Sequence, residues 1–218
     1  MKVTYYLEVI SSWCHWAEPA WAELKSKYAD RVDFQWKIAL MRPEDYPVSR
    51  EQCEWFYRRS GTIMRSAHML NPGWMVKGKG ESFDNPSLVA EAGKDFGVAD
   101  DRIRLALARA AVIDGRKVAG MAESATIGAK ASGIPVQKLK ARASSAAVRA
   151  RAEASTEEFF SHQIKQRPAF IIESAIGDKV VLSGLARAEP IAACIESMLS
   201  DAAAYKSYAA HFGSVPAK

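Results

Sequence analysis

The chain has 218 residues and a net charge of +5, and its 49% hydrophobic and 25% charged content is that of an ordinary folded protein. This composition excludes disordered and fibrous classes. No apolar run approaches the roughly 20 residues needed to span a membrane. No charged leader with a small-residue cleavage site precedes the first apolar segment. We therefore expect a cytoplasmic protein that does not associate with membranes.

The positive charge includes one basic run that alternates with alanine, formed by Lys138, Lys140, Arg142, Arg149 and Arg151. On a predicted helix such a run is typical of a solvated face, and no nucleic-acid-binding motif accompanies it, so we expect no nucleic-acid partner. The three cysteines lie far apart and form no disulfide framework; with four scattered histidines they form no zinc pattern either. We expect reduced thiols, no metal site and no tightly bound cofactor.

The first predicted elements are a strand and a helix that meet near Cys14. Residues 3–10 are rich in β-branched and aromatic side chains, which predicts a buried strand. From Ala17 to Tyr28 apolar residues recur at helical spacing. A thiol at the start of a helix meets free N–H groups and the helix dipole, which lower its pKa and favour the nucleophilic thiolate. This placement favours a reactive Cys14 over a buried, inert one, and His15 would add positive charge or a hydrogen bond.

The rest of the chain divides into a second strand, a long helical block and a final hairpin with a helix. Residues 31–40 alternate as a strand, and helices are expected from Ser49 to about Lys165, with a break near residues 144–145. Within the block, residues 60–81 form an apolar, glycine-broken loop typical of a lid or binding segment. Two strands at 168–173 and 179–183 then form a hairpin around a turn at 176–178, before the last helix.

This order, βαβ at the start and ββα at the end, predicts an α/β thioredoxin fold with a large helical insertion. We expect the thioredoxin-like domain to comprise residues 1–47 and 166–218, and the helical insertion domain residues 48–165. The strand, the Trp-Cys-His-Trp turn and a helix with Pro19 in its second turn resemble the active-site start of DsbA-like thioredoxin-fold proteins. Members of that family carry C-x-x-C, and we take Cys14 as its first cysteine, so that Ala17 stands where the second is missing.

The resemblance also implies a role for Arg167 and Pro168, because thioredoxin-like folds carry a cis proline that faces the active cysteine at this point of the chain. The backbone of this pair would then form strand-like hydrogen bonds with a peptide or with glutathione. Around Cys14 we expect Ser12, Trp13 and Trp16 to contact the substrate. The apolar loop would add His68 and Trp74, the latter covering the cysteine.

The missing second cysteine leaves three chemical alternatives for Cys14. It acts as a monothiol that uses glutathione as resolving thiol, or it is resolved by Cys53, or it attacks a carbon electrophile or helps to bind a thiol cofactor. The simpler interpretation is that Cys53 and Cys194 are packed in the core of the protein.

Two families that the chain also resembles, kappa-class glutathione transferases and 2-hydroxychromene-2-carboxylate isomerases, bear on the third alternative. They carry serine near the position of Cys14, where this chain has Ser11 and Ser12, although two serines before a helix are also ordinary caps. Their glutathione-binding stretch after the last strand reads here Gly184-Leu185-Ala186-Arg187, without the polar ligands.

The leading hypothesis is a DsbA-like thiol oxidoreductase that works through Cys14 alone, with His15 and the helix terminus activating the thiol. The alternative is a thiol- or glutathione-dependent isomerase or transferase acting on a small aromatic or polyketide-like molecule. Both hypotheses imply a small-molecule or thiol substrate, with glutathione as the expected co-substrate. Whether the chain forms a homodimer stays open, and so does a binding module or chaperone without chemistry.

Overall fold

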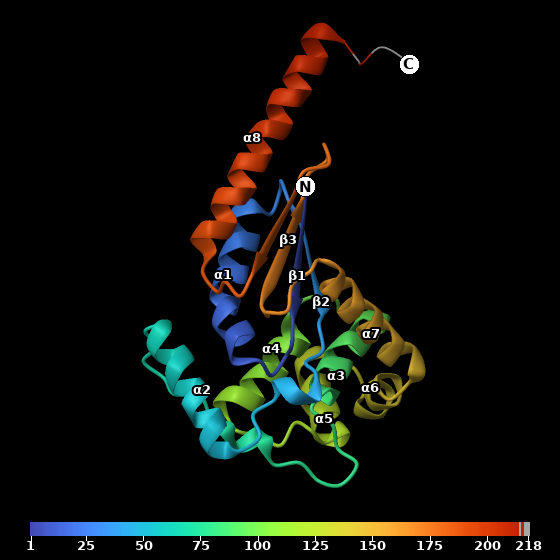
Figure 1. Ribbon diagram of the computed structural model, residues 1–218. Coiled ribbons are helices and arrows are strands. Elements are labelled where there is room, and N and C mark those ends of the chain that lie inside the picture. Colours follow the sequence, from blue (N-terminus) through green and yellow to red (C-terminus); the bar gives the residue numbers. More distant parts are fainter. Residues whose placement is uncertain (214, 216–218) are drawn as a thin grey trace.

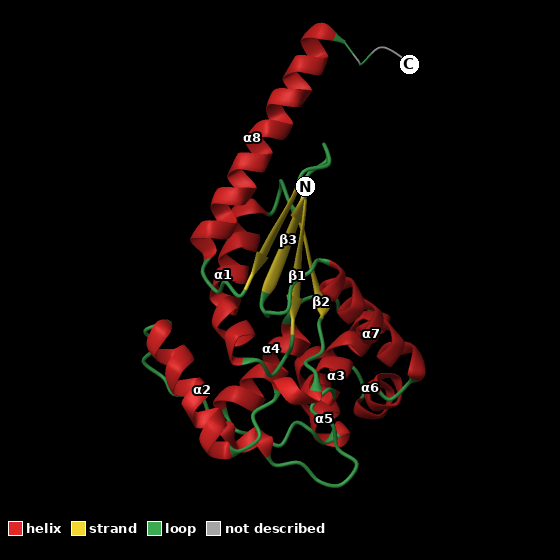
Figure 2. Ribbon diagram, in the orientation of Figure 1, coloured by secondary structure: helices red, strands yellow, loops and turns green. Residues whose placement is uncertain are grey.

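The computed structural model describes residues 1–213 and 215. A four-stranded mixed sheet has the order β2-β1-β3-β4, with β1 (Lys2–Leu7), β2 (Asp33–Ile38), β3 (Ala169–Glu173) and β4 (Lys179–Ser183). Strand β1 pairs in parallel with β2 and antiparallel with β3, and β3 pairs antiparallel with β4 (Figures 1 and 2). The two ends of the sequence therefore share one sheet, which confirms the thioredoxin fold.

Successive side chains of β1 point to opposite faces of the sheet, so they pack against different helices. Tyr5 packs with Trp21 and Phe170 on the side of α1 (Ser12–Tyr28) and α8 (Ala188–Phe212). The next residue, Tyr6, packs against Phe159 of α7 (Ala146–Ser161) on the opposite face. Figure 1 shows α1 and α8 on one side of the strands and α7 on the other.

The helical insertion runs between β2 and β3. Short helices η1 (Pro43–Asp45) and η2 (Pro72–Met75) flank α2 (Arg50–Ile63). A cluster of helices then lies at one end of the sheet: α3 (Asn85–Gly93), η3 (Lys94–Phe96), α4 (Arg102–Ala108), the π-helical η4 (Arg109–Ile113), α5 (Met121–Ser132) and α6 (Val136–Ala143). The buried core is continuous between the sheet and these helices. The division into two domains stays a prediction about the sequence, whereas the structure shows one shared core.

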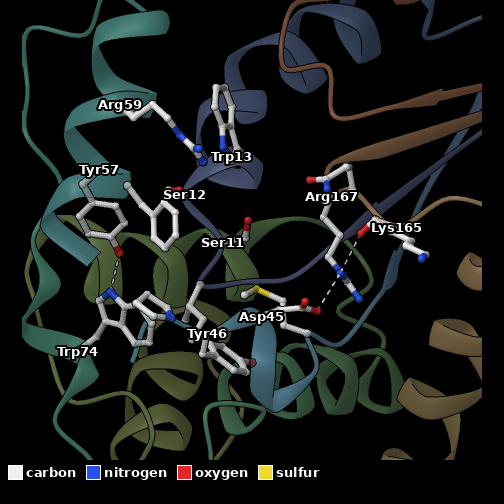
Figure 3. A pocket seen from close by; sticks show the side chains of 15 residues that line it. Ser11, Ser12, Trp13, Asp45, Tyr46, Tyr57, Arg59, Trp74, Lys165 and Arg167 are labelled. Atoms are coloured by element: carbon white, nitrogen blue, oxygen red, sulfur yellow. Dashed lines mark hydrogen bonds and ion pairs between the residues drawn. The ribbon is translucent and has the colours of Figure 1, made fainter. Parts of the chain in front are cut away.

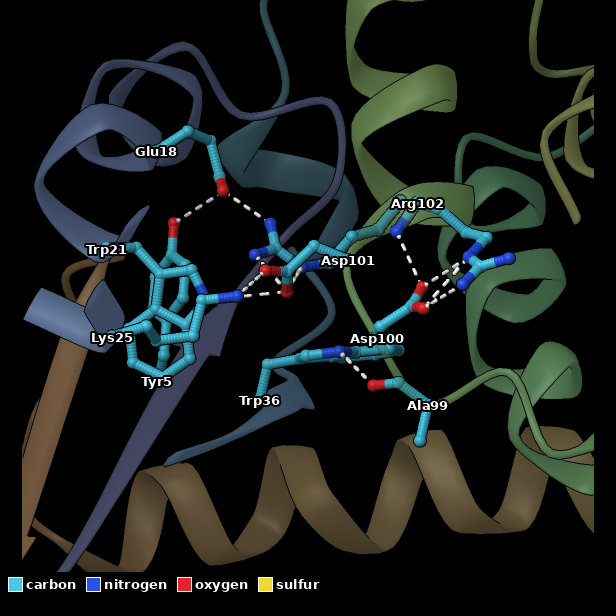
Figure 4. A network of polar contacts seen from close by, with 10 residues as sticks. Tyr5, Glu18, Trp21, Lys25, Trp36, Ala99, Asp100, Asp101 and Arg102 are labelled. Atoms are coloured by element: carbon cyan, nitrogen blue, oxygen red, sulfur yellow. Dashed lines mark hydrogen bonds and ion pairs between the residues drawn. The ribbon is translucent and has the colours of Figure 1, made fainter. Parts of the chain in front are cut away.

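A buried ion-pair network fastens the insertion to α1 (Figure 4). Arg104 of α4 is 2% exposed, and its guanidinium contacts the carboxylates of Glu18 (2.5 Å) and Asp101 (2.6 Å). Lys25 also pairs with Asp101, and Tyr5 donates its hydroxyl to Glu18. Because every charge in the network has an opposite partner, burial is tolerated here.

The predicted elements differ from the observed ones mainly at their ends. The first strand ends at Leu7 rather than at Ile10, because residues 8–11 form a buried turn closed by a hydrogen bond from Ser11 N–H to the Glu8 carbonyl (3.1 Å). The helix expected to reach Lys165 ends at Ser161. The expected break at residues 144–145 is present, since Ser145 caps α7. Among the described residues, no helix combines the length and apolarity needed to cross a membrane.

Candidate functional site

The start of α1 is built around Ser11, not around Cys14. Ser11 is the N-cap residue: its backbone is extended, its carbonyl accepts the first helical hydrogen bond from His15 N–H (2.9 Å), and its Oγ accepts from Cys14 N–H (3.5 Å). Serine is favoured at this position because its hydroxyl satisfies one of the free N–H groups at the helix start. Cys14 is consequently the third residue inside the helix, one turn farther from the helix start than its predicted position.

A cavity of about 250 Å³ opens beside Ser11, between the start of α1, the η1 segment, α2 and the segment before β3 (Figure 3). Its walls carry five large aromatic side chains, one acid and three cations, two of which have no acidic partner among the described residues. The lining residues are Ile10, Ser11, Ser12, Trp13, Met41, Asp45, Tyr46, Pro47, Phe56, Tyr57, Arg59, Trp74, Lys165, Gln166 and Arg167. The cavity is large enough for a small molecule and combines an apolar wall with polar groups, as binding sites commonly do.

Cys14 does not line this cavity, and the expectation of a lowered pKa is wrong. The side chain is 2% exposed, and burial raises the pKa of the thiol to about 12. Hydrogen bonds from the Glu8 backbone and the Ser11 side chain act in the opposite direction but are too weak to offset burial. The helix dipole favours an anion only where the terminal N–H groups can reach it, and in this conformation Cys14 N–H is directed at Ser11.

His15 does not supply positive charge to the site either. It is half-buried, its ring lies edge-on to Trp16 at 5.1 Å, and burial lowers its pKa, so the imidazole is neutral at neutral pH. Trp16 lies outside the main cavity as well. Its indole N–H donates to Ser60 Oγ (3.0 Å) and joins α1 to α2, and its ring lines a separate cavity that also includes Arg187.

The Arg167–Pro168 peptide bond is cis, as the family resemblance implied. Arg167 is buried, and its guanidinium donates to the carbonyls of Ala39 and Leu40 (2.5 Å each) at the end of β2. A longer contact of 3.8 Å joins it to Asp45. Arg167 thus fixes the segment before β3 against the end of β2, and its charge is used inside the protein.

The remaining predicted site residues separate into two groups. Ser12, Trp13 and Trp74 line the cavity. Trp74 is 2% exposed and donates its indole N–H to Tyr57 (2.6 Å), which holds the apolar loop against α2. His68 is exposed and does not line this cavity, so the structure does not bring it together with the other three residues.

Sequence reasoning missed the cations and the α2 face of the cavity. Arg59 lies over the rings of Trp55 (4.9 Å) and Phe56 (5.1 Å), and within the described residues no carboxylate pairs with it. Lys165 on the opposite wall also has no acidic partner among those residues. In Figure 3 the two serines lie between these cations. The only available signal was the helical spacing of Phe56 and Arg59.

Glu8 is a buried acid directly behind the site. It is 0% exposed; its carboxylate accepts from Ser87 Oγ of α3 (2.5 Å) and from Met41 N–H (3.3 Å), and its carbonyl accepts from Ser11 N–H. Burial raises the pKa of this carboxyl to about 7, with Arg167 acting in the opposite direction. Glu8 therefore holds the turn before Ser11 against both the insertion and the end of β2.

The other two cysteines have no part in the cavity. Cys53 is 0% exposed on α2, and burial raises the pKa of its thiol to about 11. Cys194 is half-buried on α8 rather than fully buried as expected. Across the part of the chain that the structure describes, no cluster of three or more histidine, cysteine or acidic side chains could hold a metal ion.

The strand order and the cis Arg167–Pro168 bond directly before β3 define a protein of the DsbA-like thioredoxin architecture. No protein-family model and no curated protein sequence matches the chain. Solved structures do match it. The cytosolic disulfide reductase DsbM from Pseudomonas aeruginosa aligns with a TM-score of 0.71 at 17% identity, over 92% of this chain and 99% of the other.

Two further structures agree with that match. DsbM determined with GSH has a TM-score of 0.69 at 15% identity, over 92% of this chain and 100% of the other. A candidate protein disulfide isomerase from Nitrosomonas europaea has a TM-score of 0.70 at 16% identity, over 92% of this chain and 98% of the other. The likeness at these identities is one of fold.

Proposed function

We propose that this chain is an enzyme of thiol chemistry that binds a small thiol, such as glutathione, beside Ser11 and uses it as a thiolate. One observation carries this proposal: Ser11 lies at the half-buried start of α1 in the cavity wall, while the Cys14 side chain is only 2% exposed and does not line the cavity. Ser11 and Cys14 have the spacing of a C-x-x-C pair. We infer that the missing cysteine is the one at position 11, not the one at position 17.

The site supports activation of a bound thiol in a simple way. Ser11 can turn its hydroxyl proton away from the Cys14 thiol and toward a sulfur atom in the cavity, while its Oγ still accepts from Cys14 N–H. A hydrogen bond to the thiolate, together with the positive end of the 17-residue helix α1, lowers the pKa of that thiol. The protein thus supplies electrostatic stabilisation, and the ligand supplies the nucleophile.

The walls of the cavity suit glutathione and an apolar second substrate. Arg59 and Lys165 lie on either side of the serines, where they can pair with the two carboxylates of the tripeptide. Trp13, Phe56 and Trp74 provide the aromatic surface. The bound thiolate would attack an electrophilic carbon of an apolar molecule. A carbon–sulfur bond forms, and either a leaving group departs or the sulfur leaves again after isomerisation.

A second candidate is disulfide exchange through Cys14 alone, and the structural similarity to DsbM favours it. Here the Cys14 thiolate attacks a substrate disulfide, forms a mixed disulfide and releases one thiol. A glutathione thiolate then breaks the mixed disulfide and regenerates Cys14. Because Cys14 is 2% exposed, this route requires the start of α1 to open first. Either reaction suits a reducing compartment, so we propose a cytoplasmic location.

Titration of the protein with reduced glutathione, followed by calorimetry and by the ultraviolet absorbance of the thiolate, tests the first proposal. We expect binding with a lowered thiol pKa in the unchanged chain and in Ser12→Ala, the neighbouring control. Ser11→Ala should raise the thiol pKa toward its free value. Equal thiolate signals in Ser11→Ala and Ser12→Ala would contradict the role of Ser11.

Intact-mass analysis after treatment with glutathione disulfide separates the two candidates. An unmodified Cys14, together with conjugation of glutathione to an aromatic electrophile, supports activation of the bound thiol. A single glutathione adduct that is lost in Cys14→Ser supports disulfide exchange through the buried cysteine.

A further inference from the structure

The last helix, α8, extends well beyond the body of the protein (Figure 1). It runs from Ala188 to Phe212 and packs against α1 and β3 through Ile191, Ile195 and Met198, which are all buried. Residues 203–213 are exposed. The second half of the helix therefore has no tertiary support within the described part of the chain.

The buried stripe of α8 continues into this projecting half without a change of spacing. Its members alternate by four and three residues, as in a coiled-coil seam: Ile191, Ile195, Met198, Ala202, Tyr205, Ala209 and Phe212. Tyr205 and Phe212 are 65% and 67% exposed, and Tyr208 beside the stripe is 64% exposed. An isolated helix of this length is marginal in water, and an apolar stripe on it calls for a helical partner.

We propose that residues 202–212 pair with the same residues of a second copy of this chain, in antiparallel orientation about a two-fold axis. The orientation follows from the body of the protein. The first half of the stripe faces α1 and β3 of its own chain, so a parallel partner approaching the same side would collide with that body. An antiparallel partner places its own body at the far end and covers only the projecting half.

The residue sizes along the stripe fit this pairing. With the projecting halves fully overlapped, Ala202 faces Phe212 of the second copy, and Tyr205 faces Ala209 of the second copy. Two-fold symmetry repeats both layers, so that a small residue lies opposite a large one at every level. The overlap is about 16 Å long at the rise of an α-helix. An interface of this size is smaller than that of a standard permanent dimer, so the association depends on concentration.

A positive charge next to the apolar stripe provides a second way to test the proposed pairing. Lys206 flanks the stripe on one side and lies close to its own counterpart near the axis. This repulsion is exposed and is screened by salt. Association should therefore strengthen as the salt concentration rises and in Lys206→Gln.

Sedimentation velocity of the full chain over a range of concentrations tests the pairing. We expect a concentration-dependent dimer that is lost in Tyr205→Asp and kept in Ser207→Asp, whose side chain lies on the outer face of α8. Circular dichroism with unchanged melting of the body shows that both variants fold. A monomer at every concentration, or loss of the dimer in Ser207→Asp alone, would overturn the proposal.

Cross-linking tests the direction of the pairing in a Cys194→Ser background. Tyr205→Cys and Ala209→Cys chains are prepared separately and then oxidised alone and as a mixture. We expect a covalent dimer chiefly in the mixture, where residue 205 of one copy meets residue 209 of the other. A covalent dimer formed by Ala209→Cys alone, at the same yield as in the mixture, indicates parallel helices and refutes the antiparallel arrangement.

Discussion

Cys14 N–H donates a hydrogen bond to Ser11 Oγ at 3.5 Å, yet the two side chains occupy opposite environments. Ser11 lines the cavity, and Cys14 is enclosed in the core. A C-x-x-C pair divides its work in the same way, between an accessible attacking thiol and a shielded resolving thiol. Under the function that we propose, the shielded thiol is kept at Cys14, a hydroxyl replaces the accessible thiol at position 11, and a thiol from solution supplies the attacking sulfur.

Shielding of Cys14 leads to the first prediction. With its pKa raised to about 12 and its side chain 2% exposed, Cys14 should be alkylated by iodoacetamide more slowly than a free cysteine at neutral pH. Unfolding in urea should restore the ordinary rate. Peptide mass spectrometry resolves Cys14 from half-buried Cys194, which serves as the internal control. Rapid labelling of Cys14 in the folded protein would show that the helix start opens readily.

Restoring the second thiol gives the next prediction. Ser11→Cys places two cysteines three residues apart at a helix start, within the Cα separation of about 4.4–6.8 Å that disulfides require. We expect an oxidised form two hydrogens lighter than the reduced one, and faster reduction of a model disulfide than by the unchanged chain. Ser12→Cys, with the wrong spacing, should form no internal bond with Cys14. If both variants oxidise equally, the pairing of positions 11 and 14 is wrong.

The buried acid Glu8 predicts a pH dependence of stability. Its carboxyl has a pKa of about 7 in the folded state and 4.5 as the ordinary value, so the folded state binds the extra proton between these two pH values. Stability linked to Glu8 is therefore highest below pH 4.5 and decreases as the pH rises to about 7, by roughly 3 kcal/mol in total.

Urea unfolding of the unchanged chain and of Glu8→Gln at several pH values measures this effect. The amide still accepts the hydrogen bond from Ser87 but does not titrate, so the difference in free energy between the two proteins should grow in favour of Glu8→Gln as the pH rises through that window. A difference that is constant with pH would mean that Glu8 titrates normally in the folded protein.

The network at the α1–α4 junction predicts unequal costs for two neighbouring arginines (Figure 4). Arg104→Met leaves the carboxylates of Glu18 and Asp101 without their buried cation, and removal of one partner from such a group costs about 3–5 kcal/mol. Arg102→Met breaks only an exposed pair with Asp100, and should cost at most about 1 kcal/mol. Chemical unfolding of the two variants measures both losses of stability. Equal losses in the free energy of unfolding would argue against a structural role for the buried pair.

The fold could be predicted from the sequence because its strands and helices carry clear periodicities, and because the family resemblance implied the cis bond at Pro168. The site could be predicted only in part. Val9 and Ile10 are each 2% exposed, like the strand before them, so a buried turn looked like three more strand residues. That error moved the expected helix start from Ser11, the observed N-cap, to Cys14.

Two cations of the cavity, Arg59 and Lys165, could not be predicted in this way. Arg59 and Lys165 are exposed residues in unrelated segments, and apart from the helical spacing of Arg59 from Phe56 nothing in either local pattern distinguishes them from other solvent-facing cations. They share a site only because α2 and the segment before β3 converge on the start of α1. Such convergence depends on tertiary packing of the insertion against the sheet.

The pairing of β1 on both sides has a consequence for how the chain is made. One edge of β1 binds β2, about 30 residues later in sequence, but the other edge binds residues 169–173, which leave the ribosome after the whole insertion. Until then that edge of the future central strand has no partner, while the helices of the insertion can already form from local contacts. The nascent chain should therefore acquire its helices early and close its sheet last, with residues 2–7 requiring protection in the interval.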